Sequence, residues 1–437
     1  MVEERESKVQ AWAAPFFTIW GGQAASLLGS ALVQFGLVWW LTQTTGSATV
    51  LATATLVAML PAVFIGPLAG VLVDRWDRRI VMIVADGLIA LATLGLAYLF
   101  AVGAAQVWHI YLIMFFRALG GGFHWPAMEA STSLMVPEEH LSRVAGLNQT
   151  LNGILNIVAP PVGALLLSVL PMQGILAIDV GTAVLAITPL FFIPIPQPER
   201  RGEAGAFSLV KDLREGLQYV WGWPGLMGLL IMATVLNFLL TPAFSLMPIL
   251  VTEHFGGEAI HLGWLDSAFG VGVVAGGLIL SAWGGFRRRM VTSLTGIIGI
   301  GIGTLLIGLT PATAFWFALI GSIFVGLMQP IANGPLMAII QARVEPEMQG
   351  RVFTLLRSVA TAMSPLGMAI AGPVADWLGV RTWYWVGGAA CVLMGVGAFF
   401  TPAILYLEDN HRKRESRETG SRVGDVGYEV QGAGGRE

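Results

Sequence analysis

Long apolar runs alternate with short polar segments along all 437 residues of the chain. A helix needs about 20 apolar residues to cross the roughly 30 Å hydrocarbon core of a bilayer. Because lipid cannot hydrogen-bond to the backbone, such runs are expected to be helical. Twelve can be placed, at about 16–41, 50–73, 80–102, 109–131, 145–169, 174–196, 225–251, 262–284, 291–310, 315–341, 352–375 and 382–407.

Composition supports the same class. Hydrophobic residues make up 55% of the chain and charged residues 12%, whereas soluble domains are about a quarter charged. The pattern therefore predicts an all-α integral membrane protein. Cys391 is the only cysteine, which excludes internal disulfides and cysteine-based metal sites. We expect neither a metal nor a cofactor, and the absence of a G-x-x-x-x-G-K-[ST] motif argues against an ATP-driven pump within this chain.

Basic residues predict the orientation of the spans. The turns after even-numbered spans hold nearly all of the Lys and Arg between spans, whereas the turns after odd-numbered spans hold only Arg381. Short loops keep positive charge in the cytoplasm, so both termini are expected there, with the first span retained as a helix. The expected organisation is a cytoplasmic N-terminal segment at 1–15, six spans at 16–196, a cytoplasmic central loop at 197–224, six spans at 225–407 and a disordered cytoplasmic tail at 408–437.

The two halves also carry a repeat. Three residues around spans 4 and 5 recur at a constant spacing around spans 10 and 11: Pro126, Pro137 and Glu138 return as Pro335, Pro346 and Glu347. The repeat runs in the same direction in both halves. It predicts two six-helix bundles related by a parallel repeat.

The segment from Gly66 to Ile80, GPLAGVLVDRWDRRI, changes abruptly from apolar to charged between spans 2 and 3. It resembles the loop signature of the major facilitator superfamily of transporters, roughly G-x-x-x-D-R-x-x-R-[RK]. The matching residues are Gly70, Asp74, Arg75, Arg78 and Arg79. The resemblance implies a conformational latch, in which Asp74 accepts hydrogen bonds from a neighbouring helix N-terminus and so joins the two halves. The alternative is that the arginines only determine topology.

Further segments indicate which members of the superfamily the chain resembles most. TIWGGQAASLLGSAL, TGSATVLATATL, VLVDRWDRRIVMIVADG, VPEEHLSRVAG and GRVFTL resemble Mef-type macrolide efflux proteins, and more distantly siderophore exporters of the same superfamily. Arg117, in RALGGGF, matches the superfamily's arginine in span 4. Pro160 and Gly163, in APPVGA, match a weakened antiporter motif whose two outer glycines are alanine here. Together these segments imply the major facilitator fold over about 390 residues.

Five residues are candidates for intramembrane charge or proton coupling. Arg117 is expected to face the cavity or a partner, because an unpaired arginine in lipid is costly. Asp86 enters from the opposite face, too far along its helix to pair easily with Arg117, and is expected to support the charged turn. Asp179, Asp266 and His124 are candidates for proton coupling. Their alternative role is a structural hydrogen bond.

Amide side chains are candidates for substrate contacts. The resemblance implies that spans 1, 4, 7 and 10 line the cavity. Those spans and span 5 carry the candidates, which are Gln23, Gln34, Asn152, Asn156, Asn237, Gln329 and Asn333. The alternative is that the amides join one helix to another.

The expected function is secondary active transport: export of amphipathic drug-like compounds, nearest to macrolides, by alternating access and proton antiport. Two alternatives remain open, an exporter of an endogenous metabolite such as a siderophore, and a non-transporting membrane receptor or scaffold. We expect no enzymatic activity. The expected partners are a small-molecule substrate, protons and the lipid bilayer of a bacterial inner membrane. A monomer without nucleic acid is expected.

Overall fold

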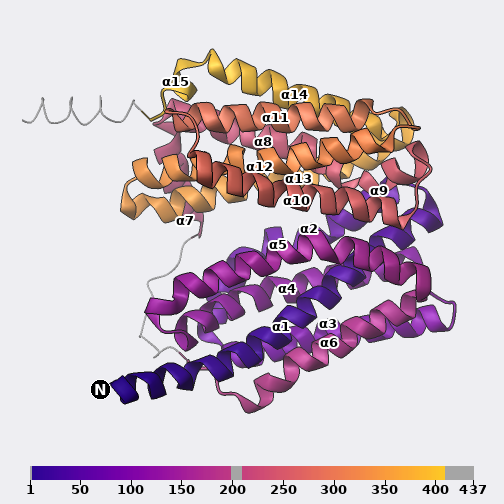
Figure 1. Cartoon of the computed structure of the whole chain (residues 1–437), viewed down its shortest axis with the longest axis vertical. Helices are drawn as coiled ribbons and strands as arrows, with labels where there is room; N and C mark the ends of the chain where they lie inside the picture. The colour runs from indigo at the N-terminus through magenta and orange to yellow at the C-terminus, as the bar shows by residue number, and fades with distance from the viewer. Residues whose placement is uncertain (1, 198–208, 409–437) are drawn as a thin grey trace, which may run out of the picture.

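The protein folds into two helical bundles, which lie one above the other in Figure 1. The structure is a computed structural model that describes residues 2–197 and 209–408. The expected disorder of the C-terminal tail concerns residues that lie almost entirely outside this part of the chain. Each predicted span overlaps one long helix, which confirms the all-α prediction and the two six-helix bundles.

The N-terminal bundle consists of six long helices: α1 (Val2–Thr45), α2 (Ala48–Arg75), α3 (Arg78–Ala101), α4 (Val107–Met135), α5 (Glu138–Val169) and α6 (Met172–Phe192). The long helices of the C-terminal bundle are α8 (Pro224–Ser245), α10 (Ala259–Trp283), α11 (Arg289–Leu309), α12 (Phe315–Arg343), α13 (Pro346–Leu378) and α14 (Arg381–Phe399). Ten helices of the described chain are long and apolar enough to cross a membrane.

Two predicted spans are too long at their C-terminal ends. The span at 225–251 ends with α8 at Ser245, and is followed by the single turn α9 (Met247–Ile249) and the π-helix η1 (Leu250–His254). The span at 382–407 ends with α14, and the short α15 (Pro402–Leu405) follows it. A proline lies just after each break, Pro248 and Pro402, and proline cannot continue the hydrogen bonding of a preceding helix.

The central loop contains a further helix, α7 (Leu209–Trp221). Its Glu215 pairs with Arg351 near the start of α13, with 2.8 Å between Oε2 and Nη1. Leu217 and Trp221 are exposed on α7. The helix therefore belongs to the C-terminal bundle.

Side-chain caps fix two turns that define the faces of the protein. Ser47 caps α2 by accepting a hydrogen bond from the Val50 amide (3.3 Å), after Gly46 has reversed the chain with a positive φ of 58°. Asp77 caps α3 by accepting hydrogen bonds from the amides of Arg79 (2.9 Å) and Ile80 (3.3 Å). Such caps satisfy helix amides that have no partner within the helix. We call the face with the Gly46–Ser47 turn the far face, and the one with the Trp76–Asp77 turn the basic face.

Glycines bring helices of the C-terminal bundle into backbone contact. A Cβ atom on Gly276 of α10 would lie 2.1 Å from the Leu327 carbonyl oxygen of α12, and one on Gly326 would lie 2.1 Å from the Phe269 carbonyl oxygen. In lipid, close van der Waals packing of this kind replaces the hydrophobic effect as the force that associates helices. Gly272 and Gly276 therefore serve packing.

Two helix pairs make most of the contact between the two bundles. In the α5–α10 pair, the Ser267 hydroxyl donates to the Ile157 carbonyl (2.7 Å), and a Cβ on Gly263 would lie 3.1 Å from the Pro160 carbonyl oxygen. In the α2–α13 pair, Gly372 packs on Thr49. Gly263, Thr49 and Gly372 lie near the far-face ends of their helices. These contacts therefore join the bundles in the far half of the protein.

Candidate functional site

A cavity with a volume of about 610 Å³ lies in the C-terminal bundle. Its wall is mainly apolar, with side chains from α8, α10, α11, α12 and α14. Three of the predicted amides line it: Asn237, Gln329 and Asn333. The Asn333 side-chain amide donates to the Gln329 side-chain oxygen (2.8 Å), so these two act as one polar patch on α12. We call this space the C-terminal cavity.

Asp266 contributes the carboxylate of the C-terminal cavity. It lies on α10, seven residues after the helix begins, and its side chain is half-buried. Within the described chain, no hydrogen bond or ion pair reaches this carboxylate. Phe244 and Phe269 line the same cavity, with ring centroids 6.3 Å apart. An apolar, aromatic wall with one uncompensated carboxylate suits an amphipathic molecule that carries a cation.

A second cavity of about 370 Å³ lies in the N-terminal bundle between α1, α2, α3 and α4. Five of the predicted site residues line this N-terminal cavity: Gln23, Gln34, Asp86, Arg117 and His124. Unlike Asp266, the charged residues of this cavity have charged or polar partners.

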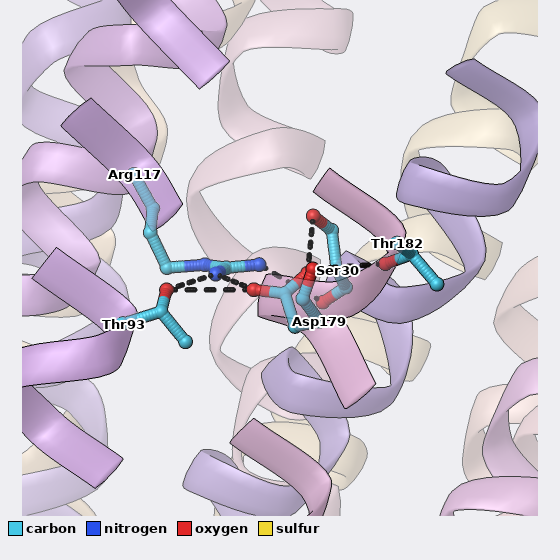
Figure 2. Close-up of polar contacts among 5 residues, drawn as sticks. All are labelled: Ser30, Thr93, Arg117, Asp179 and Thr182. Carbon is cyan, nitrogen blue, oxygen red and sulfur yellow. Dashed lines mark hydrogen bonds and ion pairs between the residues drawn. The ribbon is translucent and has the colours of Figure 1, made fainter. Parts of the chain in front are cut away.

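Arg117 is paired with Asp179, with 2.5 Å between Nη1 and Oδ2 (Figure 2). The same Arg117 nitrogen donates to the Thr93 hydroxyl (2.9 Å), and the Ser30 hydroxyl donates to the other Asp179 oxygen (3.1 Å). The network thus ties α1, α3, α4 and α6 together. The sequence predicted that Arg117 would face the cavity or a partner, and the structure places it beside Asp179 and in the wall of the N-terminal cavity. For Asp179 the alternative to proton coupling was a structural hydrogen bond, and its carboxylate accepts such bonds from Ser30 and Arg117.

Asp86 does not support the charged turn. Its Oδ2 accepts a hydrogen bond from the Gln23 side chain (3.1 Å) and lies 3.4 Å from His124 Nε2. The expectation was wrong because it compared the depth of Asp86 only with that of Arg117. His124 lies on α4 two helical turns beyond Arg117 in the direction of the basic face. It is therefore closer to the basic face than Arg117 is, at the same level as Asp86.

The other predicted amides divide between a cavity and an interface. Asn152 lines a small cavity of about 50 Å³ together with Trp125. Asn156 lines none of these three cavities. Its backbone instead packs 3.4 Å from the position of a Cβ on Gly270, at the α5–α10 contact between the bundles. The cavity prediction is therefore not supported for Asn156.

The charged turn is held within the N-terminal bundle. Arg78 is buried and donates to the Ala130 carbonyl of α4 (2.8 Å), and Arg79 donates to the Phe191 carbonyl at the end of α6 (2.6 Å). Arg75 is exposed. The surroundings of Gly70 and the side chain of Asp74 lie outside the described residues, so the latch remains a prediction.

The antiporter-like motif lies at helix contacts. A Cβ on Gly163 would lie 2.9 Å from the Phe35 ring of α1, and the Pro160 carbonyl packs against Gly263 of α10. α5 continues through Pro160 without a break. Pro160 and Gly163 therefore position α5 between α1 and α10.

Sequence reasoning missed Asp376 on α13, whose carboxylate binds the start of α2 in the opposite bundle. It also missed Ser30 and Thr93, which support the Arg117 pair. Serine and threonine are too frequent in membrane helices to be distinguished by sequence, but the G-x-x-x-D pattern at Gly372–Asp376, shared with Gly70–Asp74, is a usable signal.

Two helical bundles, each with its own cavity, define a multi-pass membrane protein of the transporter type. The chain belongs to the Major Facilitator Superfamily, whose profile matches residues 19–256 and 241–427. It is a transporter and not an enzyme.

Individual relatives cover most of the chain. It is 35% identical to macrolide efflux protein A of Streptococcus pyogenes over 389 residues, which are 89% of this chain and 96% of that one. It is 28% identical to the multidrug efflux pump Tap of Mycobacterium tuberculosis over 410 residues, 90% and 95% of the two chains. The fold is similar to a bacterial homologue of the human lysosomal transporter Spinster, with a TM-score of 0.63 at 15% identity, over 92% and 97% of the two chains.

Proposed function

We propose that this transporter exports amphipathic drug-like molecules, macrolides among them, by alternating access in exchange for protons. Macrolide efflux protein A and the multidrug pump Tap resemble the chain over at least 89% of its length, which supports drugs as the substrate class. The observation that carries the proposal is the C-terminal cavity, where an apolar wall surrounds the uncompensated carboxylate of Asp266.

Asp266 is the proposed coupling residue. A carboxylate in a largely apolar cavity is stabilised either by a proton or by the cationic group of a substrate. Antiport follows if the two compete: a proton that enters from outside displaces the substrate outward, and loss of that proton to the cytoplasm frees the carboxylate for the next substrate. Gln329 and Asn333 provide hydrogen bonds for the polar groups of the substrate.

The N-terminal cavity has a different proposed role. Arg117 and Asp179 neutralise each other and hold four helices together, so we assign them a structural role. Asp86 and His124 form the second candidate proton site, because two titratable side chains lie 3.4 Å apart there.

The basic face is the proposed cytoplasmic face, because short loops retain arginine on that side. Both termini are then cytoplasmic and the far face is external. Since the described contacts between the bundles lie in the far half, the structure corresponds to a state that is closed to the outside. The protein acts as a monomer in a bacterial inner membrane.

Drug accumulation in bacteria without their own efflux pumps tests the proposal. Cells that express the protein are expected to accumulate less erythromycin than control cells, and a protonophore is expected to abolish the difference. Asp266→Asn is expected to abolish it as well, whereas Glu139→Gln, which removes an exposed acid outside the cavities, is expected to preserve it. Equal accumulation with the protein confirmed in the membrane would contradict the proposal and favour an endogenous substrate or a receptor role.

A further inference from the structure

One carboxylate crosses from the C-terminal bundle to the N-terminal bundle at the far face. Asp376, near the C-terminal end of α13, accepts hydrogen bonds from the backbone amides of Ala48 (2.8 Å) and Thr49 (3.2 Å) at the start of α2. The hydroxyls of Thr49 (2.6 Å) and Ser47 (3.3 Å) donate to the same carboxylate. Asp376 therefore caps a helix that belongs to the other half of the protein.

Backbone packing supports this cap. A Cβ atom on Gly372, one turn before Asp376, would lie 2.3 Å from the Thr49 Cα. Real Cβ atoms do not approach a backbone atom so closely, so only glycine lets α13 approach α2 to this distance. The carboxylate and the glycine thus hold the same two helix ends together by independent means.

The sequence contains the same pattern on the partner helix. Gly70 and Asp74 have the spacing of Gly372 and Asp376, and each pair lies in the last turns of its helix. α2 runs from the far face to the basic face, whereas α13 runs in the opposite direction. Each aspartate therefore lies in the last turn of its helix, at the face where the other helix begins.

We propose that Asp376 and Gly372 form a latch that closes the far face, and that it alternates with a latch of Asp74 at the basic face. This inference rests on the alternating access of the proposed function. A carboxylate at a helix N-terminus makes charge-assisted hydrogen bonds and interacts favourably with the helix dipole. Because α2 and α13 belong to different bundles, opening the far face requires these bonds to break. The transporter then exchanges one reciprocal contact for the other.

The distance between two spin labels at the far face tests the latch in the full-length, reconstituted protein. We would attach labels to cysteines at the exposed positions Thr44 and Ala312, one in each bundle, in a Cys391→Ala background. Asp376→Asn is expected to raise the ratio of far-face-open to far-face-closed molecules about tenfold, the effect of losing one charge-assisted hydrogen bond. Asp74→Asn is expected to shift the ratio in the opposite direction.

Glycine variants provide a second test that does not depend on charge. Gly372→Ala is expected to open the far face as Asp376→Asn does, whereas Gly277→Ala, where a Cβ meets no atom within 4 Å, is expected to change nothing. Thr49→Ala, which removes only one hydroxyl donor, is expected to cause a smaller shift and serves if Asp376→Asn does not fold.

The two proposals fail in different ways. An unchanged distance distribution in Asp376→Asn and Gly372→Ala, or a shift in the same direction for Asp74→Asn, would overturn the latch even if the wild type exports drugs. A wild type that shows the expected opposite shifts but exports no drug would support the latch and contradict the proposed substrate class.

Discussion

Arg117 and Asp179 form an ion pair in the N-terminal bundle, with 2.5 Å between Nη1 and Oδ2, although 62 residues separate them in the chain. The pair leaves no net charge at this position of the bundle. Asp266 in the C-terminal cavity has no such partner among the described residues. This difference is the basis of the proposal that Asp179 holds the bundle together and that Asp266 exchanges protons or binds substrate.

Removal of the Asp179 charge is expected to destabilise the protein. Asp179→Asn leaves Arg117, whose side chain is only 10% exposed, without its counter-ion. Breaking comparable buried pairs costs about 3 to 5 kcal/mol. Thermal unfolding in detergent is expected to shift to a clearly lower temperature. The double variant Arg117→Met with Asp179→Leu removes both charges and is expected to recover much of the loss. A double variant as unstable as the single one would contradict charge compensation.

Alanine substitutions at two adjacent glycines on α10, Gly276 and Gly277, are expected to have very different effects on stability. A Cβ on Gly276 would lie 2.1 Å from the Leu327 carbonyl oxygen, whereas a Cβ on Gly277 meets no atom within 4 Å. Gly276→Ala is expected to cost about 1 to 3 kcal/mol through overpacking, and Gly277→Ala to be neutral or slightly stabilising because alanine is the better helix former. Both are measured by thermal unfolding, and equal effects would argue against backbone contact between α10 and α12.

The polar patch on α12 is expected to affect transport and not folding. Gln329→Ala removes the side-chain acceptor of the Asn333 amide in the C-terminal cavity. The apparent affinity for erythromycin is expected to fall by about tenfold, the effect of roughly one hydrogen bond to substrate. Unfolding temperature serves as the control and is expected to stay close to that of the wild type. Unchanged transport would remove this patch from the substrate site.

Glu253, outside the membrane spans, is expected to make stability depend on pH. Although Glu253 is exposed, partial burial and then the negative charge of Asp376 raise the pKa of its carboxyl above the usual 4.5. The folded state therefore retains this proton to higher pH than the unfolded state, so stability falls as pH rises from 4.5 through the raised pKa. Glu253→Gln is expected to raise the unfolding temperature at neutral pH but not below pH 4.5. A rise in unfolding temperature both at neutral pH and below pH 4.5 would show that the effect comes from packing and not from the charge of Glu253.

The sequence predicts the helices well because span length and loop charge are local properties. The pairing of Arg117 with Asp179 could also have been predicted from the sequence. The two residues lie 10 and 7 residues from the far-face ends of α4 and α6, at similar depths of about 15 and 11 Å. The contact of Asp376 with Ala48 depends instead on how the two bundles dock. Residues 328 positions apart meet there, and no local pattern fixes that arrangement.

Proton movement driven by substrate tests the central claim most directly. The protein is reconstituted into liposomes with a pH-sensitive dye inside, and erythromycin is added without any other gradient. Antiport predicts proton release that depends on erythromycin in the wild type and is absent in Asp266→Asn, with Glu139→Gln as the control that retains it. Erythromycin transport without proton movement would contradict antiport, and the same proton movement in Asp266→Asn would contradict the role of this carboxylate.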